Sequence, residues 1–299
     1  MTMTSPAPAS AAPAATERHA RRSARRRRWM RKHPPLILGA VLLVLVAGLS
    51  LAAPWIATHD PQALDPLARL APPSAAHPFG TDALGRDLFS RVMWGGRASL
   101  VVGLTVAVLA TSAGVLLGLA AGFVRRADGL VMRLMDGLMA IPDILLAIAL
   151  MAVTRASLTT VIVAITVPQV PRVVRLVRSL ALSLREQQYV EAARALGTRL
   201  PVILWRHVLP NMVTPLVVQA TFIAATAMLT EALLSFLGVG LPPQIPSWGT
   251  MMADGRNFVA VAFHAVLFPG LFLAATVLSV NLVGDGLRDA LDPRLSRQL

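Results

Sequence analysis

The stretch REQQYVEAARALGTRLPVILWRHVLP, residues 185–210, is a polar segment set between long apolar ones. Its first half places small or apolar residues at positions i, i+3, i+4 and i+7 of one helix face, namely Tyr189, Ala192, Ala193 and Leu196. Polar residues fall on another face of the same turns, namely Gln187, Glu191 and Arg194. The pattern predicts a short amphipathic helix. Because two of the four residues in this stripe are alanine, another surface can approach closely, and we interpret the helix as a docking element.

Turn signals follow this helix on its carboxyl side. Gly197 stands where a left-handed C-terminal cap is expected, since glycine adopts a positive φ at no steric cost. Pro201 can open a second short helix, because a first-turn position needs no amide hydrogen. Pro210 marks the next boundary. The segment is therefore predicted to hold two short helices joined by a turn at Gly197.

The composition places the rest of the chain in a membrane. Of its 299 residues, 55% are apolar and 14% are charged, whereas soluble domains average about 45–50% apolar and about 25% charged residues. The absence of cysteine excludes disulfides, cysteine-ligated zinc, iron–sulfur clusters and a thiol nucleophile. The six histidines show no spacing of the HExxH type. The sequence therefore predicts no metal site.

Positive charge is concentrated near the amino terminus. Nine of the 28 lysine and arginine residues lie between Arg18 and Lys32, directly before an apolar run. Basic residues beside an apolar span are an orientation signal that holds that end in the cytoplasm. A nucleic-acid patch is the less favoured interpretation of the net charge of +13, since aromatic residues that could stack on bases are few.

The amino-terminal residues 1–34 are predicted to form a disordered basic tail, because they lack the large apolar groups of a core. The apolar run from Leu36 to Ala57 resembles a signal peptide in outline, and the small residues around Leu51 have cleavage-like spacing. A run of about 20 residues exceeds the usual signal core of about 7–15 and is long enough to span a bilayer. A retained first helix is therefore favoured over cleavage.

Five further apolar runs bring the number of predicted spans to six. Long apolar runs, rather than short alternating strands, predict helices and not a barrel. Pro168 and Pro171 are expected to interrupt the fourth span. The distribution of arginine predicts that both termini lie in the cytoplasm, and that residues 58–96 and 238–255 lie outside. The predicted spans are 36–57, 100–124, 134–153, 158–174, 213–237 and 259–283.

Motifs for catalysis are absent from the sequence. A phosphate-binding loop of the GxxxxGK[ST] type needs a lysine, and Lys32 is the only lysine in the chain. There is no GxSxG elbow, and the acidic residues of the spans are too scattered to propose an acid–base pair. We therefore expect no catalytic residues and no enzymatic activity in this chain.

Acidic residues within the predicted spans form a second set of candidates, because charge in a membrane is costly and often functional. Arg133, three residues before Asp136, predicts a structural ion pair there. Asp143 follows Pro142, where its carboxylate can cap the following helical segment, although a pathway role stays open. Glu231 could cap locally, bind a partner helix or line a pathway, and the sequence does not separate these roles.

EAARALG, followed ten residues later by His207 and then by Pro210, resembles the cytoplasmic EAA loop of membrane subunits in ABC importers. Further blocks in the same order resemble the dipeptide and oligopeptide permease family, DppC or OppC type. The resemblance covers about residues 34–295. The additional blocks are HPFGTDALGRDLFSRVMWGGRASL, EALLSFLGVGLPPQIPSWGTM and NLVGDGLRDALDPRL.

The resemblance implies an all-α membrane protein with six transmembrane helices and the type I ABC importer permease fold. It implies a subunit of the bacterial plasma membrane that works with a second permease of DppB or OppB type, two ABC ATPase subunits that bind ATP and magnesium, and an extracytoplasmic substrate-binding protein. No cofactor is expected on this chain itself. The implied domains are a tail (1–34), a first helix with an extracytoplasmic segment (35–98), the permease domain (99–288) and a cytoplasmic tail (289–299).

The implied function is ATP-driven uptake of dipeptides or short oligopeptides, although similar machinery carries nickel chelates or glutathione. In this family the EAA loop inserts into a cleft of the ATPase subunit. The resemblance implies that Ala192 and Ala193 let the loop seat closely against the ATPase subunit. It implies polar contacts for Glu191 and Arg194, and it places the turn between the two short helices at Gly197. The other docking candidates are Tyr189, Leu196, His207 and Pro210.

Two alternatives to this docking role belong to other classes. An amphipathic helix lying on the membrane surface is disfavoured, because the polar face has one Glu and one Arg and no basic bias. A stand-alone ion-coupled transporter would be supported by inverted repeats or by clustered buried acids, and the sequence shows neither.

The loop at residues 238–255 is where the resemblance implies that a binding protein docks, with Trp248 and Arg256 as candidates. A turn shaped only for packing is equally compatible with the sequence. Trp248 could also anchor at the membrane interface, where tryptophan is enriched.

Overall fold

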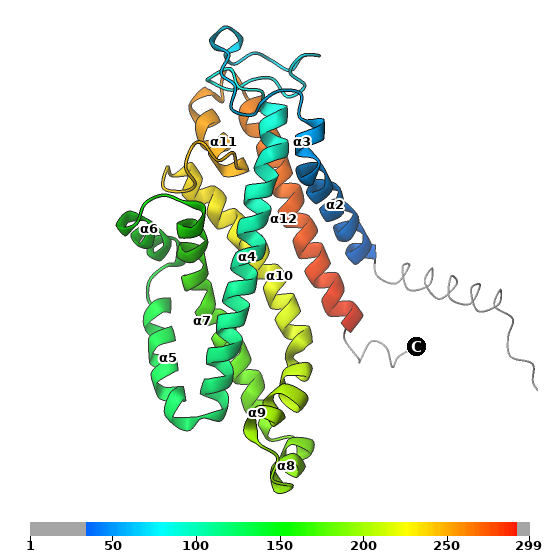
Figure 1. Ribbon diagram of the computed structural model, residues 1–299, viewed down its shortest axis with the longest axis vertical. Helices are drawn as coiled ribbons and strands as arrows, with labels where there is room; N and C mark the ends of the chain where they lie inside the picture. Colours follow the sequence, from blue (N-terminus) through cyan, green and yellow to red (C-terminus); the bar gives the residue numbers. More distant parts are fainter. Residues whose placement is uncertain (1–33, 292–299) are drawn as a thin grey trace, which may run out of the picture.

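The long helices of the protein run side by side in an elongated bundle (Figure 1). The computed structural model describes residues 34–291, and all regular secondary structure in that range is helical. The predicted amino-terminal tail, apart from Pro34, and residues 292–299 of the carboxyl-terminal tail lie outside the described residues. The end of the bundle that carries α8 (Gln188–Ala195) is called the α8 end, and the opposite end, with α11 (Trp248–Gly255), the α11 end.

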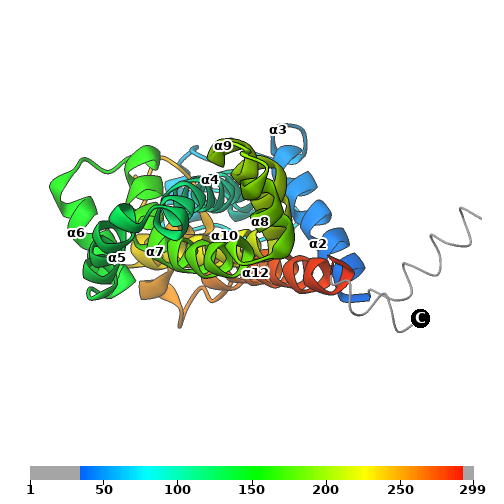
Figure 2. The same cartoon turned by 90° about the horizontal axis from the view of Figure 1, so that it is seen from below.

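Five helical segments are each long and apolar enough to cross a membrane, and a bent helix pair supplies a sixth if it counts as one span. The prediction of six membrane helices is confirmed on that count. The bent pair flanks one side of the bundle and α2 the other (Figure 2). The five segments are α2 (Pro34–Leu51), α4 (Leu88–Phe123), α7 (Leu158–Arg185), Leu200–Phe236, which ends in α10 (Leu209–Phe236), and α12 (His264–Leu291).

The third predicted span is broken. Helices α5 (Arg125–Met139) and α6 (Asp143–Val153) meet at 90°, so the prediction of one continuous span at 134–153 is wrong. The break falls at Pro142, which has no amide hydrogen to donate and restricts the residue before it to extended backbone. Asp143 therefore begins a new helix instead of continuing α5.

Helix α7 is continuous through Pro168 and Pro171, so the predicted interruption of the fourth span is wrong. Both prolines are buried among neighbouring helices. Proline is tolerated in a membrane helix when its neighbours support the local backbone.

Helices α4 and α7 pack at very short range because α4 presents glycine every fourth residue. A Cβ added at Gly114, Gly118 or Gly122 would lie 2.3–2.6 Å from a side-chain carbon of α7. Small residues at this spacing let helix backbones approach closely in a membrane. The opposing residues are Val173, Val177 and Ala181. This contact fixes α7, and therefore the start of the polar segment that follows it.

Ion pairs order the segment before α4, which the sequence analysis placed outside the membrane. Arg86 contacts Asp82 at 2.6 Å and Asp254 at 2.8 Å, and the buried Arg91 lies 3.7 and 3.5 Å from the same two carboxylates. Asp254 belongs to α11, so these pairs join the irregular segment before α4 to that helix. Helix α4 begins at Leu88, and the expected domain boundary at 98–99 falls inside it.

Asp87 caps the first turn of α4 and accepts hydrogen bonds from the amide and hydroxyl of Ser90, at 2.8 and 2.7 Å. Burial alone would raise the pKa of the Asp87 carboxyl. Hydrogen bonds with Ser90, His77 and Thr58 outweigh burial and hold this pKa below its ordinary value.

Candidate functional site

The segment 185–210 folds as two short helices across the α8 end (Figures 1 and 2). Helix α8 is followed by a turn, by α9 (Leu200–Ile203) and by one π-helical turn (Leu204–Val208) that leads into α10. The predicted pair of helices is therefore confirmed. Pro210 stands in the first turn of α10, one residue from the predicted boundary, although the helical path continues through it.

Gly197 makes the turn after α8 with φ +75°, as predicted. The amide of Thr198 donates to the carbonyl of Ala193, and the amide of Gly197 donates to the carbonyl of Arg194. These two bonds are the Schellman pattern, which requires a residue in the left-handed region and is met most easily by glycine. A Cβ added at Gly197 would meet nothing within 4 Å, so only the backbone conformation restricts this position.

One face of α8 and α9 anchors them to the bundle. Val190 and Ala193 are buried, and Ile203 of α9 and Val208 of the π-helical turn join the same apolar core. The guanidinium of Arg194 lies over the ring of Phe123 at the end of α4, 5.6 Å from its centroid. Helix α8 is therefore fixed along one side, against the apolar core and the end of α4.

The opposite face leaves large apolar side chains in the open. Leu196 is 85% exposed, and Tyr189 and Ala192 are also exposed. Of the four residues in the predicted apolar stripe, only Ala193 is buried, so most of the stripe points outward. Trp205, in the π-helical turn of the same segment, is also 75% exposed. The sequence analysis did not single out Trp205, although a tryptophan within a polar segment was a usable signal.

The remaining docking candidates lie on the same element. Glu191 is exposed on α8, and the ring of His207 lies 6.4 Å from the ring of Tyr189. Arg194 is exposed, but its guanidinium already contacts Phe123 within the chain. We define the outer face of segment 185–210 by five of its exposed residues, Tyr189, Glu191, Ala192, Leu196 and Trp205.

Three aspartate–arginine pairs join α5 and α6 to α7. Asp128 pairs with Arg178 through both carboxylate oxygens. Asp136 contacts Arg175 at 2.6 Å, so the predicted pair with Arg133 is wrong. The partner of Asp136 lies on α7, a different helix. Residue spacing within α5 alone cannot predict such a contact, because it depends on how the two helices pack.

Asp143 occupies the first position of α6, and no side chain caps that helix, so its predicted capping role is wrong. Its carboxylate contacts Arg172 of α7 at 2.6 Å. The pairing gives Asp143 a structural contact that joins the start of α6 to α7.

Glu231 of α10 is fully buried and binds a partner helix, one of the roles that the sequence left open. It accepts hydrogen bonds from Ser99 of α4 at 3.3 Å and from Ser235 of its own helix at 2.9 Å. Ser247, the N-cap of α11, donates to the same carboxylate at 2.8 Å. Glu231 therefore holds α4, α10 and α11 together.

Trp248 is 0% exposed, and its indole nitrogen donates to the carbonyl of Val92 at 3.0 Å. Its burial leaves no indole surface for docking or for contact with lipid headgroups, which favours the packing role over the other two interpretations. Residues 248–255 form α11 instead of a loop, because Ser247 and Thr250 close a capping box. Arg256 is exposed and donates to the carbonyl of Phe236.

Comparison with known families gives two matches along the chain. Residues 114–297 match the family described as "Binding-protein-dependent transport system inner membrane component". The chain belongs to this family. Residues 23–73 match the "N-terminal TM domain of oligopeptide transport permease C". The resemblance of the sequence to membrane subunits of ABC importers is thereby confirmed.

Named relatives of this transport component cover nearly all of it. The "Probable peptide ABC transporter permease protein y4tQ" of Sinorhizobium fredii is 52% identical over 271 residues, 91% of this chain and 93% of the relative. The "Glutathione transport system permease protein GsiD" of Pectobacterium atrosepticum is 41% identical over 90% of each chain.

A solved structure of the MetNI methionine ABC transporter in an inward-facing conformation resembles the fold, with a TM-score of 0.56 and 20% identity. The match covers 68% of this chain and 96% of the other. The predicted fold class, an all-α membrane protein with the type I ABC importer permease fold, is confirmed.

Proposed function

We propose that this transport component is one of two permease subunits in an ATP-driven importer of dipeptides or short oligopeptides, and that separate ATPase subunits drive it through segment 185–210. A second, similar permease, two ATPase subunits that carry ATP and magnesium, and an extracytoplasmic substrate-binding protein complete the complex. The peptide cargo is supported by the relative named as a peptide transporter at 52% identity, against 41% for the glutathione relative.

The outer face of segment 185–210 is the observation that carries this proposal. Leu196 and Trp205 are large apolar side chains, and each is at least 75% exposed. Exposed apolar residues gathered on one element mark an interaction surface. Because Val190, Ala193 and Ile203 fix the other face in the core, a partner that moves this element moves the bundle.

The turn at Gly197 offers the sharpest test of coupling. Gly197→Val places a β-branched residue at φ +75°, which strains the turn without creating a clash elsewhere. Gly197→Asn is the matched control, since asparagine tolerates the left-handed region. In the complete complex reconstituted in vesicles, we expect Gly197→Val to lose peptide uptake and peptide-stimulated ATP hydrolysis, and Gly197→Asn to keep most of both.

The result would speak against coupling through this element if Gly197→Val were inserted and assembled normally and kept both activities. Loss of uptake with full stimulation of ATP hydrolysis would also contradict the proposal, because it would place the defect outside the route from the ATPase. Co-purification of all subunits establishes assembly before either activity is compared.

The proposed topology places the α8 end and both termini in the cytoplasm of a bacterial plasma membrane. Arg125 and Arg126 begin α5 beside that end, in accord with the bias of basic residues toward the cytoplasm. The chain has no cysteine, so single-cysteine variants report without background. We expect an impermeant thiol reagent added outside intact cells to label Leu67→Cys but not Leu196→Cys, and the reverse pattern would invert the topology.

The cargo is identified most directly by measuring which compounds the substrate-binding partner binds. We expect that partner to bind dipeptides or short oligopeptides more tightly than nickel chelates or glutathione in a calorimetric assay. Tighter binding of glutathione or of a nickel chelate would replace the cargo and leave the coupling role intact. Uptake by this chain alone, without ATPase subunits, would instead support a stand-alone transporter.

A further inference from the structure

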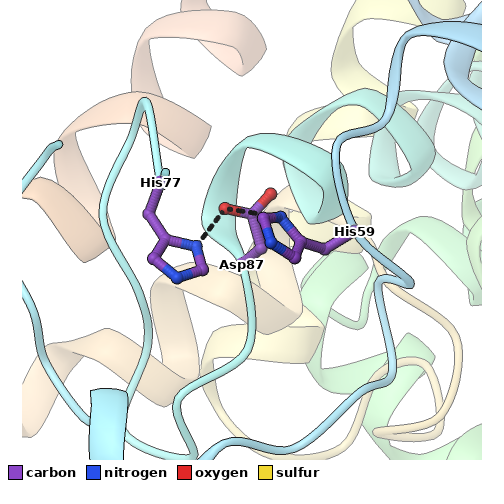
Figure 3. A group of neighbouring side chains, drawn as sticks. All are labelled: His59, His77 and Asp87. Carbon is purple, nitrogen blue, oxygen red and sulfur yellow. Dashed lines mark hydrogen bonds and ion pairs between the residues drawn. The ribbon is translucent and has the colours of Figure 1, made fainter. Parts of the chain in front are cut away.

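Three side chains from separate segments of the α11 end converge on one point (Figure 3). His59 follows α3 (Ala53–Ile56), His77 lies in the irregular segment after it, and Asp87 caps α4. Their candidate ligand atoms all lie within 4.8 Å of one another. The positions 59, 77 and 87 follow no metal-binding motif, so sequence spacing did not reveal the group.

The two imidazoles face the same carboxylate oxygen. Nδ1 of His77 lies 2.9 Å from Oδ1 of Asp87, and Nδ1 of His59 lies 4.0 Å from it. The two rings are stacked with centroids 4.7 Å apart. A hydrogen bond between His77 and Asp87 accounts for the first contact, but the second exceeds hydrogen-bonding distance. Asp87 therefore does not hold the His59 ring directly.

Outer contacts hold the group in place and leave one carboxylate oxygen for a ligand role. Oδ2 of Asp87 accepts from the amide and hydroxyl of Ser90 and from the hydroxyl of Thr58 at 3.1 Å. The amide of His59 donates to the Ser90 hydroxyl at 3.1 Å. Metal ligands are commonly oriented by such outer hydrogen bonds. Oδ1, which faces both imidazoles, is the oxygen that these contacts leave.

We propose that His59, His77 and Asp87 form a binding site for a divalent cation of the zinc type, which fastens the segment before α4 to the start of that helix. Two imidazole nitrogens and one carboxylate oxygen suit zinc, whereas magnesium and calcium prefer oxygen ligands. Water takes the fourth position, because the His59 side chain is partly open to solvent.

The distances fit such an ion after a small movement of His59. Zinc bonds of about 2.0–2.2 Å in a tetrahedron keep ligand atoms roughly 3.4 Å apart, and the observed 2.9 and 4.0 Å lie on either side of that value. Nδ1 of His59 lies 3.0 Å from the hydroxyl of Thr58. A turn of the partly exposed ring toward Oδ1 exchanges that contact for a bond to the ion.

The test compares His59→Asn with the parent chain. His59→Asn removes one ligand but keeps the contact between His77 and Asp87, so the fold of the segment is retained. Asp60→Asn is the matched control, since Asp60 is the exposed neighbour of His59 and, among the described residues, its carboxylate accepts only from the amide of Gln62. The full-length chain is purified in nanodiscs, stripped with a chelator and titrated with zinc chloride by calorimetry.

We expect the parent and Asp60→Asn to bind one zinc ion with similar affinity. We expect His59→Asn to bind it at least about tenfold more weakly, because loss of an outer-shell partner alone weakens metal binding roughly 10–100-fold. The melting temperature of the parent should rise with zinc but not with magnesium, and cobalt should give the intense visible bands of a tetrahedral site. Equal zinc titrations for the parent and His59→Asn would overturn the proposal, as would weak octahedral cobalt bands. Equal melting temperatures of both chains in chelator verify that the variant is folded.

Discussion

Segment 185–210 and α11 both interrupt the apolar spans with mixed polar and aromatic residues, yet they place those residues in opposite ways. At the α8 end, Trp205 is 75% exposed and Leu196 is 85% exposed. At the α11 end, Trp248 is 0% exposed and Glu231 is enclosed by three serine hydroxyls. One region leaves its large apolar side chains exposed, and the other buries such residues in contacts within the chain.

The difference shows that a conspicuous residue type does not reveal its role until its surroundings are known. Buried polar groups need partners inside the protein, because an unsatisfied group in a low-dielectric interior is costly. Glu231 satisfies that need with hydroxyls from α4, α10 and the start of α11. Exposed apolar groups have no such internal use, and the outer face of segment 185–210 is accordingly the part proposed to meet a partner.

The two tryptophans provide the largest expected contrast. Trp248→Ala removes a fully buried indole and should lower the free energy of unfolding by about 3–5 kcal/mol. Trp205→Ala removes an exposed one and should change that free energy by less than about 0.5 kcal/mol. Thermal denaturation in nanodiscs, followed by recovery on gel filtration, measures both. Equal losses would mean that Trp205 also packs inside, and the comparison would fail.

Substitution of Glu231 tests the buried hydrogen bonds of the α11 end, with the next largest expected effect on stability. Glu231→Leu leaves the hydroxyls of Ser99, Ser235 and Ser247 without this acceptor, at about 1–3 kcal/mol for a group left unsatisfied. Glu231→Gln retains an acceptor oxygen and should lose less. We expect the melting temperatures to fall in the order parent, glutamine variant, leucine variant. A leucine variant as stable as the parent would show that the network adds nothing to stability.

The fold was largely predictable because long apolar spans and turn chemistry are local properties. Gly197 is the clearest example, since the left-handed cap follows from one residue type at the end of a short helix. Pro142 carried the same kind of local signal, but the apolar run continues on both sides of it and hides the 90° bend. Pro168 and Pro171 are buried in an unbroken helix because neighbouring helices pack against them, and the sequence does not show which helices those are.

The candidate site was predictable as a segment, but not as a surface. The stripe of Tyr189, Ala192, Ala193 and Leu196 was recognisable from spacing, whereas Val190 supplies the buried face together with Ala193. A helix of eight residues presents apolar groups on two sides, and only the packed bundle decides which side is buried. Contacts across segments, such as Asp136 with Arg175, likewise require the packed bundle.

Substitution of Leu196 tests whether the outer face of segment 185–210 binds the ATPase subunits. Leu196→Asp places a charge on the proposed contact surface and should weaken binding of the ATPase subunits by roughly tenfold, or about 1.4 kcal/mol. Leu67→Asp is the matched control, because Leu67 is 99% exposed and belongs to the segment between α3 and α4, which lies at the α11 end (Figure 1). The fraction of ATPase that co-purifies over a range of concentrations measures the effect. Equal weakening by both substitutions would argue for a general charge effect and not for docking at α8.

The smallest expected effects concern the aspartate–arginine pairs between α5, α6 and α7, which lie between the two regions. Exposed ion pairs contribute about 0–1 kcal/mol and are screened by salt. Asp128→Asn breaks a two-bond contact with Arg178 and should lower the melting temperature slightly at low salt, whereas Asp136→Asn breaks a more exposed single contact with Arg175 and should change it less. Both differences should vanish in high salt. A loss that persists there would show that the pair holds α5 by geometry as well as by charge, and would give the flank of the bundle the same inward-facing character as α11.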